Sequence, residues 1–186
     1  LNDAQGRNVF DDGGDEGTPI MRHAVAGLIR TMQENALVFA PHENSFRRLL
    51  PGAHAPSSVA WGYENRTVAV RIPGGDPRAR RIEHRVAGAD ANPYLVLASI
   101  LGGAFLGIEN GWEPPSPIQG DAYSQNLETL PPDWASAIEA FSRGAHVPEI
   151  YARRLQRMFV QCKVQELRRF TRHVTEFEYH SYMEAV

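Results

Sequence analysis

The chain has 186 residues, enough for one domain with a hydrophobic core. Its net charge of -3, with 42% hydrophobic and 22% charged residues, argues against a nucleic-acid-binding protein or one that binds anionic membranes. The longest apolar stretch, residues 94–108, contains three glycines and is short for a membrane span. The single cysteine excludes an internal disulfide and predicts a reducing, cytoplasmic location.

The first half of the chain mixes helical and extended patterns. Thr18 and Pro19 are typical of a helix start, and apolar residues at helical spacing predict a helix to about residue 37. A loop bounded by prolines follows. Strands are predicted at 58–63, 66–72 and 80–86, with a turn at Glu64 and Asn65 between the first two.

Helices dominate the second half. A helix from residue 93 is apolar nearly all round, which predicts a central, buried position, and its three glycines predict close backbone packing. Further helices are predicted at 133–143 and 148–171, with a capping box at 175–178 starting a short last one. We therefore predict an α+β fold in which antiparallel strands line an active-site cleft, pack against helices and are followed by a helical C-terminal tail.

Positive charge gathers in one segment. Residues 47–85 contain eight arginines and three acids, a local excess of 8 − 3 = +5. Arginine suits bidentate contacts with carboxylate and phosphate, so this segment predicts a site for small anions. The whole chain has one lysine, Lys163, so part of the preference for arginine is open to a purely compositional explanation.

The sequence "RIEHR" places Arg81, Glu83 and Arg85 at alternate positions of the third predicted strand, and therefore on one face. Such a face can hold a hard cation on the carboxylate and anions on the arginines, or it can be a solvated salt-bridge strip. Arg66 and Arg71 are an odd number of residues apart. Either Arg66 belongs to the turn or the strand contains a bulge.

Three segments, "NSFRRLLPGAHAP", "AWGYENRTVAVRIP" and "RRIEHRVAGADANPYLVLASILGG", closely resemble the C-terminal part of the glutamine synthetase catalytic domain in their order and spacing. The resemblance is strong from about residue 20 to 111 and weaker in the helical tail. "WGYENRT" and the Gly-Gly after "RIP" are more similar to the γ-glutamylpolyamine synthetase branch than to the ammonia-using enzymes.

The resemblance implies a ligase that activates glutamate with ATP, through γ-glutamyl phosphate, for attack by an amine. By residue-to-residue match, Arg48 and Arg85 are expected to bind glutamate, and Arg66 to lie against the transferring phosphoryl group. Arg71 and Arg81 match arginines that hold the nucleotide phosphates. Positive charge of this kind stabilises phosphoryl transfer.

Two further expectations concern metal and assembly. Glu83 matches a ligand of the Mg²⁺ or Mn²⁺ that is bound with ATP. Family members form homo-oligomeric rings with active sites between subunits, and they carry additional metal-binding residues upstream of the matched segments. We therefore expect residues 1–186 to be the C-terminal portion of such a domain, inactive alone.

One loop departs from the family pattern. Ammonia-using members have an aromatic residue and a glutamate where this chain has Ala53 and His54. Because an imidazole attracts ammonium less than a carboxylate does, the loop predicts an alkylamine or polyamine acceptor and gives His54 a catalytic position. The alternative is an ordinary loop histidine. Trp61 and Tyr63 either stack on a cationic amine or belong to the core.

Three other functions remain open from the sequence. The chain could belong to a glutamine synthetase that uses ammonia. It could be a non-catalytic module that takes part only in ring assembly. RNA binding by the arginines is a further alternative, but the net acidity and the lack of aromatic residues among the arginines argue against a nucleic-acid partner.

Overall fold

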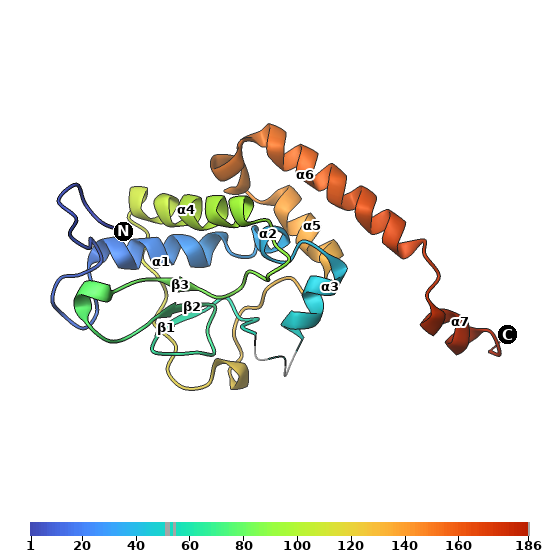
Figure 1. The fold of residues 1–186 in the computed structure, drawn as a ribbon, viewed down its shortest axis with the longest axis horizontal. Helices are drawn as coiled ribbons and strands as arrows, with labels where there is room; N and C mark the ends of the chain where they lie inside the picture. The colour runs from blue at the N-terminus through green and yellow to red at the C-terminus, as the bar shows by residue number, and fades with distance from the viewer. Residues whose placement is uncertain (51–52, 54, 186) are drawn as a thin grey trace.

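The structure is a computed structural model and describes residues 1–50, 53 and 55–185. The long helices α1 and α4 lie on one side of a small three-stranded sheet, and the last two helices extend away from the main body (Figure 1). The elements are α1 (Pro19–Thr31), α2 (Ala36–Phe39), α3 (Glu43–Phe46), β1 (Trp61–Tyr63), β2 (Val70–Ile72), β3 (Glu83–His84), α4 (Pro93–Glu109), α5 (Trp134–Arg143), α6 (Val147–Thr171) and α7 (Glu176–Tyr182), with 3₁₀ turns at Arg47–Leu49, Pro77–Ala79 and Ala122–Ser124.

Helices α1 and α4 lie side by side and cross at glycines (Figure 1). A Cβ atom on Gly27 of α1 would lie 2.7 Å from the backbone nitrogen of Gly107, and one on Gly103 would lie 2.6 Å from Thr31 Oγ1. Both helices begin as the sequence predicts, because the Thr18 and Asn92 side chains accept hydrogen bonds from first-turn backbone N–H groups. The predicted close packing of the α4 glycines is confirmed.

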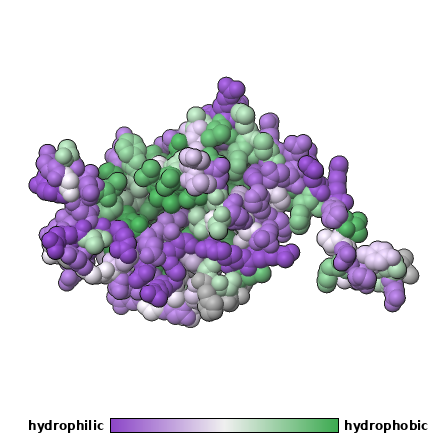
Figure 2. All heavy atoms as spheres, in the orientation of Figure 1, coloured by the Kyte–Doolittle hydropathy of each residue, from purple (hydrophilic) through white to green (hydrophobic). Residues whose placement is uncertain are grey.

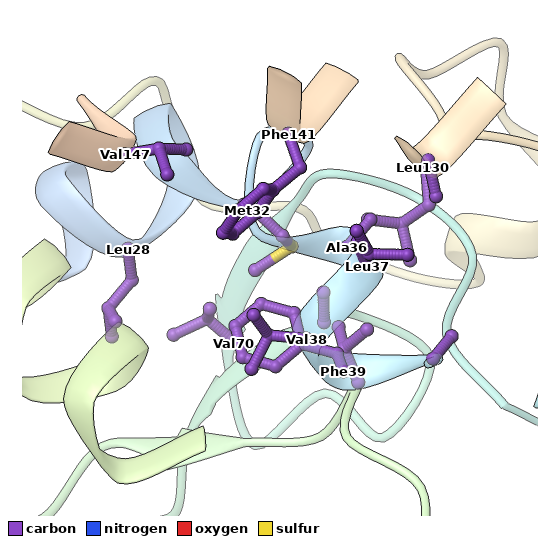
Figure 3. Packing of buried hydrophobic residues seen from close by; sticks show 14 of the residues in the cluster. Leu28, Met32, Ala36, Leu37, Val38, Phe39, Val70, Leu130, Phe141 and Val147 are labelled. Carbon is purple, nitrogen blue, oxygen red and sulfur yellow. The ribbon is translucent and has the colours of Figure 1, made fainter. Parts of the chain in front are cut away.

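The hydrophobic core lies between the helices and the inner face of the sheet. Side chains of α1, α2, β2, α5 and the start of α6 interdigitate there (Figure 3). Burying this apolar surface supplies the main driving force for folding. The labelled members of the cluster are Leu28, Met32, Ala36, Leu37, Val38, Phe39, Val70, Leu130, Phe141 and Val147.

The sheet is mixed, so the predicted antiparallel pairing of the first two strands is wrong. Strand β1 pairs in parallel with β2, and β2 pairs antiparallel with β3. A tight hairpin would reverse the chain direction. Residues 64–69 instead return the chain to the starting end of β1, so that β2 runs in the same direction as β1. The side chain of Asn65 fixes this turn: Oδ1 accepts from Thr67 N, and Nδ2 donates to the carbonyl oxygens of Ile118 and Gly120. The predicted α+β class is confirmed.

Helix α4 is less buried than its composition predicts. One face packs on α1, but the opposite face exposes Tyr94, Leu97, Leu101 and Phe105, each more than half exposed. A hydrophobic area covers the position of α4 in the space-filling view (Figure 2). Apolar composition shows that a face favours burial, whereas the neighbouring elements decide whether it is covered.

The C-terminal helices match their predicted limits closely. Asp133 caps α5, and a capping box at Thr175 and Glu178 starts α7. Within α6, Ala152 has a φ of 63° and interrupts the helix after its first turns. Across the described part of the chain, no helix combines the length and apolarity needed to cross a bilayer.

Candidate active site

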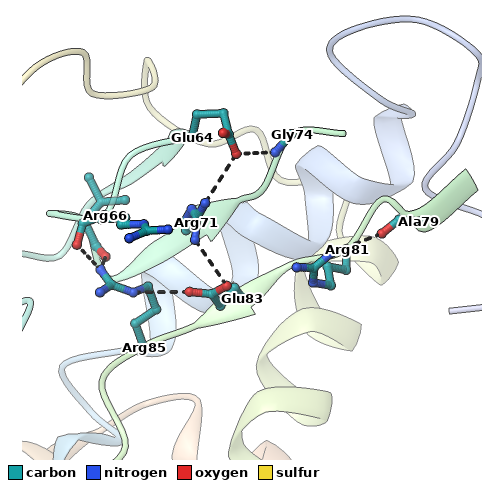
Figure 4. Close-up of polar contacts among 9 residues, drawn as sticks. Glu64, Arg66, Arg71, Gly74, Ala79, Arg81, Glu83 and Arg85 are labelled. Atoms are coloured by element: carbon teal, nitrogen blue, oxygen red, sulfur yellow. Dashed lines mark hydrogen bonds and ion pairs between the residues drawn. The ribbon is translucent and has the colours of Figure 1, made fainter. Parts of the chain in front are cut away.

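Strands β2 and β3 form the scaffold of the site. Their antiparallel register places Arg71 directly opposite Glu83, with the preceding pair Val70 and His84 beside it. Directly opposed residues of an antiparallel pair send their side chains to the same face of the sheet. Arg71 and Glu83 therefore extend toward each other, and Arg85 reaches the same carboxylate from two residues further along (Figure 4).

The cluster is held by ion pairs. Arg71 Nη1 lies 3.6 Å from Glu83 Oε2, and Arg85 Nε lies 3.3 Å from Glu83 Oε1. The two arginine side chains are 15% and 21% exposed, so their charges are partly withdrawn from water. Because a buried charge without a partner is costly, the position of the Glu83 carboxylate between the two guanidinium groups gives each of them a neighbouring negative charge.

Arg66 lies in the turn before β2, which is one of the two positions its spacing from Arg71 predicts. Its carbonyl oxygen accepts a hydrogen bond from Arg85 Nη1, and the same nitrogen donates to Val68 O at 3.1 Å. These bonds attach Arg85 to the turn that carries Arg66. The Arg66 side chain itself is exposed beside the cluster (Figure 4).

Two predicted site residues lie at the edges of this arrangement. The guanidinium of Arg48 donates to Val86 O at 2.6 Å and to Arg85 O at 3.1 Å, which connects the arginine-rich loop to the end of β3. Arg81 is exposed, and its one recorded hydrogen bond, to Ala79 O, is 3.5 Å long. His54 lies outside the described residues.

The cluster offers both anion-binding and metal-binding groups. Arg71 Nε is buried and has no hydrogen-bond partner among the described residues, so this donor of the cluster is unsatisfied. Glu83 supplies the hard oxygen donor that Mg²⁺ prefers. The described residues contain no group of three or more His, Cys, Asp or Glu side chains placed to hold a metal. The arrangement fits a phosphate-bearing ligand together with one protein ligand of a divalent ion.

Sequence reasoning missed Glu64, which binds the far side of Arg71. Its Oε1 lies 3.4 Å from Arg71 Nη2 and accepts a hydrogen bond from the backbone N–H of Gly74. The sequence predicts a turn at Glu64 and Asn65, but no local pattern predicts that this turn brings Glu64 beside Arg71. Glu64 and Gly74 also line a cavity of about 410 Å³, a volume within the range of small-molecule sites.

The aromatic pair beside this cavity has divided roles. Trp61 is 2% exposed, and its Nε1 donates to Pro115 O at 2.7 Å, so it belongs to the core. Tyr63 is only partly buried and lines the cavity, with its hydroxyl donating to Glu16 O at 2.8 Å. Of the two rings, Tyr63 is the one that a ligand could reach.

His84 lies on the opposite side of the sheet from Glu83, as strand alternation predicts. Its ring packs against Phe39 with 4.5 Å between centroids, and its Nδ1 is buried with no partner among the described residues. Burial lowers the pKa of His84 to about 4. The imidazole is therefore neutral near pH 7, and its packing against Phe39 stabilises the strand that carries Glu83.

Comparison with known proteins identifies the family of the chain. The family model for the glutamine synthetase catalytic domain matches residues 1–182. Gamma-glutamylputrescine synthetase PuuA of Escherichia coli K12 is 38% identical over 94% of this chain. Gamma-glutamylethanolamide synthetase GlnA4 of Streptomyces coelicolor is 36% identical over 96%, and glutamate–isopropylamine ligase of a Pseudomonas species is 31% identical over the whole chain. The chain spans 37%, 38% and 42% of these relatives' lengths, respectively.

Solved structures give the same result. GmaS without ligand superposes with a TM-score of 0.84 at 30% identity, over 97% of this chain and 42% of that one. A complex of GmaS with ADP gives a TM-score of 0.83, again at 30% identity and over 97% of this chain. With the family model matched across nearly all residues and the same fold in these neighbours, the chain belongs to the glutamine synthetase catalytic-domain family.

Proposed function

We propose that this chain forms the C-terminal portion of the catalytic domain of an ATP-dependent ligase, which joins the γ-carboxylate of glutamate to an amine through γ-glutamyl phosphate. One observation carries the proposal: Arg71 on β2, Glu83 on β3 and Arg85 directly after β3 lie together in a chain of the glutamine synthetase family. The printed names of the relatives, a putrescine, an ethanolamide and an isopropylamine enzyme, support the ligase reaction.

The proposed roles follow the charges of the site. Arg71 and Arg81 bind nucleotide phosphates, and Arg66 faces the transferring phosphoryl group. Glu83 provides one ligand to Mg²⁺ or Mn²⁺, and the bound ion would neutralise charge on the phosphate oxygens. All of these groups act by positioning and by electrostatic stabilisation, which are the main protein contributions to phosphoryl transfer.

The glutamate side of the site is assigned to Arg85 and Arg48. The guanidinium of Arg48 donates to the main-chain oxygen of Arg85 at 3.1 Å, which supports assigning both residues to the same part of the site. A pair of guanidinium groups suits the α-carboxylate of glutamate, because each can donate two parallel hydrogen bonds to a carboxylate. Binding there would orient the γ-carboxylate toward the phosphoryl group that Arg66 faces.

We infer an alkylamine or polyamine as the acceptor in place of ammonia. The sequence at Ala53 and His54 lacks the aromatic residue and the carboxylate of ammonia-using enzymes. That change removes bulk and one negative charge, which weakens the attraction for a small cation. The two relatives named above with the highest identities are, by name, synthetases of gamma-glutamylputrescine and gamma-glutamylethanolamide, which supports the same inference.

The acceptor is tested by comparing kcat/KM for putrescine, spermidine, ethanolamine and ammonium in the intact protein, and then in His54→Glu. We expect an organic amine to be preferred, and ammonium to gain activity in the variant. A clear preference of the unmodified protein for ammonium would instead identify a glutamine synthetase. If the unmodified protein has a higher kcat/KM for organic amines but His54→Glu has no higher kcat/KM for ammonium, the preference is real and His54 is not its cause.

We further propose that the active protein is a cytoplasmic ring with sites between subunits, and that residues 1–186 alone release no ADP in the presence of glutamate. The incomplete metal ligand set of the described residues supports this. Size measurement by light scattering tests the ring. A ring without any ATP turnover would favour the assembly module over the enzyme.

A further inference from the structure

Glu64 has an unusual backbone conformation. Its φ is 51°, in the left-handed region that favours glycine, and within the described chain it shares this property with one other non-glycine residue, Ala152. A non-glycine residue in this region carries a conformational cost and persists when surrounding contacts compensate for it. Glu64 is held by its backbone N–H, which donates to Ile72 O at 2.9 Å, and by its carboxylate, which binds the Gly74 backbone N–H and Arg71.

These contacts extend the ion-pair cluster into an alternating row. Glu64, Arg71, Glu83 and Arg85 follow one another, with separations of 3.4, 3.6 and 3.3 Å between successive partners (Figure 4). Each inner member therefore has two partners of opposite charge. Arg71 is the inner arginine, and its 15% exposed side chain has a carboxylate on each side.

The row has a consequence for metal binding at Glu83. Both oxygens of Glu83 now face arginines, so a metal ion that binds this carboxylate competes with Arg71 and Arg85. A half-buried guanidinium that lost its only partner would resist that exchange. Arg71 has a second partner in Glu64, whose own position is fixed by Gly74. It can therefore release Glu83 without losing its counter-charge.

We propose that Glu64 is a positioning residue, which holds Arg71 toward the phosphates while Glu83 is released to a metal ion. This rests on the ligase function proposed above and adds a residue to it. The lowered pKa of Glu64, caused first by the Gly74 N–H and further by Arg71, keeps its carboxylate charged for this role. A Cβ on Gly74 would lie 3.0 Å from Glu64 Cδ, so the loop and the carboxylate also fit closely.

Glu64→Gln in the intact protein tests the proposal. The amide oxygen can still accept from Gly74, so the variant removes mainly the charge that faces Arg71. We expect the KM for the ATP–Mg²⁺ complex to rise about fivefold, with little change in kcat. Binding of Mn²⁺ in the presence of ADP, followed by electron paramagnetic resonance, should weaken by a similar factor.

Glu139→Gln is the matched control. Glu139 forms an ion pair with Arg143 at 2.8 Å on α5, and both side chains are more than half exposed. This variant should leave the KM for ATP and the Mn²⁺ affinity unchanged. Glu64→Asp keeps the charge on a shorter side chain and should restore part of the affinity that Glu64→Gln loses.

Each outcome separates the two proposals. Unchanged KM and Mn²⁺ affinity in Glu64→Gln would overturn the positioning role while leaving the ligase intact. If kcat and thermal stability both fall while Mn²⁺ affinity is unchanged, the role of Glu64 is purely structural, and the positioning role is overturned as well. If the intact protein releases no ADP with glutamate and any of the amines, the ligase proposal fails, and Mn²⁺ binding alone decides the role of Glu64.

Discussion

The α1–α4 crossing and the charged row on β2 and β3 are both close-packed regions, but they depend on opposite properties of their residues. At the crossing, Gly27, Gly103 and Gly107 allow two backbones to touch because they have no side chains. In the row, long side chains from separate segments share their partners (Figure 4). An added atom should therefore disrupt the crossing, whereas the loss of one charge should disturb function before stability.

The most damaging change should be Gly27→Ala. The new Cβ would lie 2.7 Å from Gly107 N and 2.9 Å from Gly107 Cα, and backbone atoms cannot rotate away as a side chain could. We expect the free energy of unfolding to fall by about 3 kcal/mol, measured by urea denaturation. Gly14→Ala is the control, because its Cβ would meet only the side chain of Asp12, at 3.3 Å. Equal stabilities of the two variants would show that the crossing is looser than its contacts indicate.

Glu83→Ala should affect catalysis most among changes in the row. It removes the proposed metal ligand and the shared partner of Arg71 and Arg85. We expect ATP turnover by the intact protein to fall about 100-fold, with the far-ultraviolet circular dichroism unchanged. Unchanged turnover would mean that "RIEHR" is a surface salt-bridge strip, as the alternative interpretation of the sequence holds.

Acid should lower the stability of the fold through His84, which is buried on the side of the sheet opposite Glu83. Its folded-state pKa is lowered to about 4, so the unfolded chain binds a proton more readily between that value and about 6.5. The contribution of His84 to stability is therefore complete above about pH 6.5 and decreases as the pH falls. Between pH 7 and pH 5 the loss should be about 2 kcal/mol.

This contribution is measured as the difference in pH dependence between the natural protein and His84→Leu, since other groups titrate in both. Exposed His173 provides the control. In His173→Gln the free energy of unfolding should change with pH as steeply as it does in the natural protein. If His84→Leu shows the same pH dependence too, the imidazole is hydrated in solution.

The smallest effect is expected at the exposed pair of Glu139 and Arg143 on α5. These residues are four apart on one helix, and such solvated pairs contribute about 0.3–0.5 kcal/mol. Glu139→Gln should lower stability by that amount at low salt and by less in 1 M NaCl, because salt screens the pair. A loss above about 1 kcal/mol would show that even exposed pairs of this chain are strongly coupled, and would remove the contrast with the row.

Local signals in the sequence determined most of the helices. Thr18 with Pro19, Asn92 with Pro93, Asp133 and the capping box at Thr175 each mark a helix start that the structure confirms. These signals act between residues that are two or three positions apart, so they do not depend on the rest of the fold. The face shared by Glu83 and Arg85 follows equally from the two-residue period of a strand.

Tertiary structure decided the rest, because it depends on contacts between distant segments. The parallel pairing of β1 with β2 follows from the bonds between Asn65 and residues 118–120, which no pattern near Asn65 predicts. The place of Glu64 in the row follows from the same loop. For α4, composition indicated an apolar helix, but only the packing of α1 showed which face is buried and which, with Leu101 and Phe105, is exposed. Periodicity describes one element at a time, whereas burial and ion pairing are properties of its neighbours.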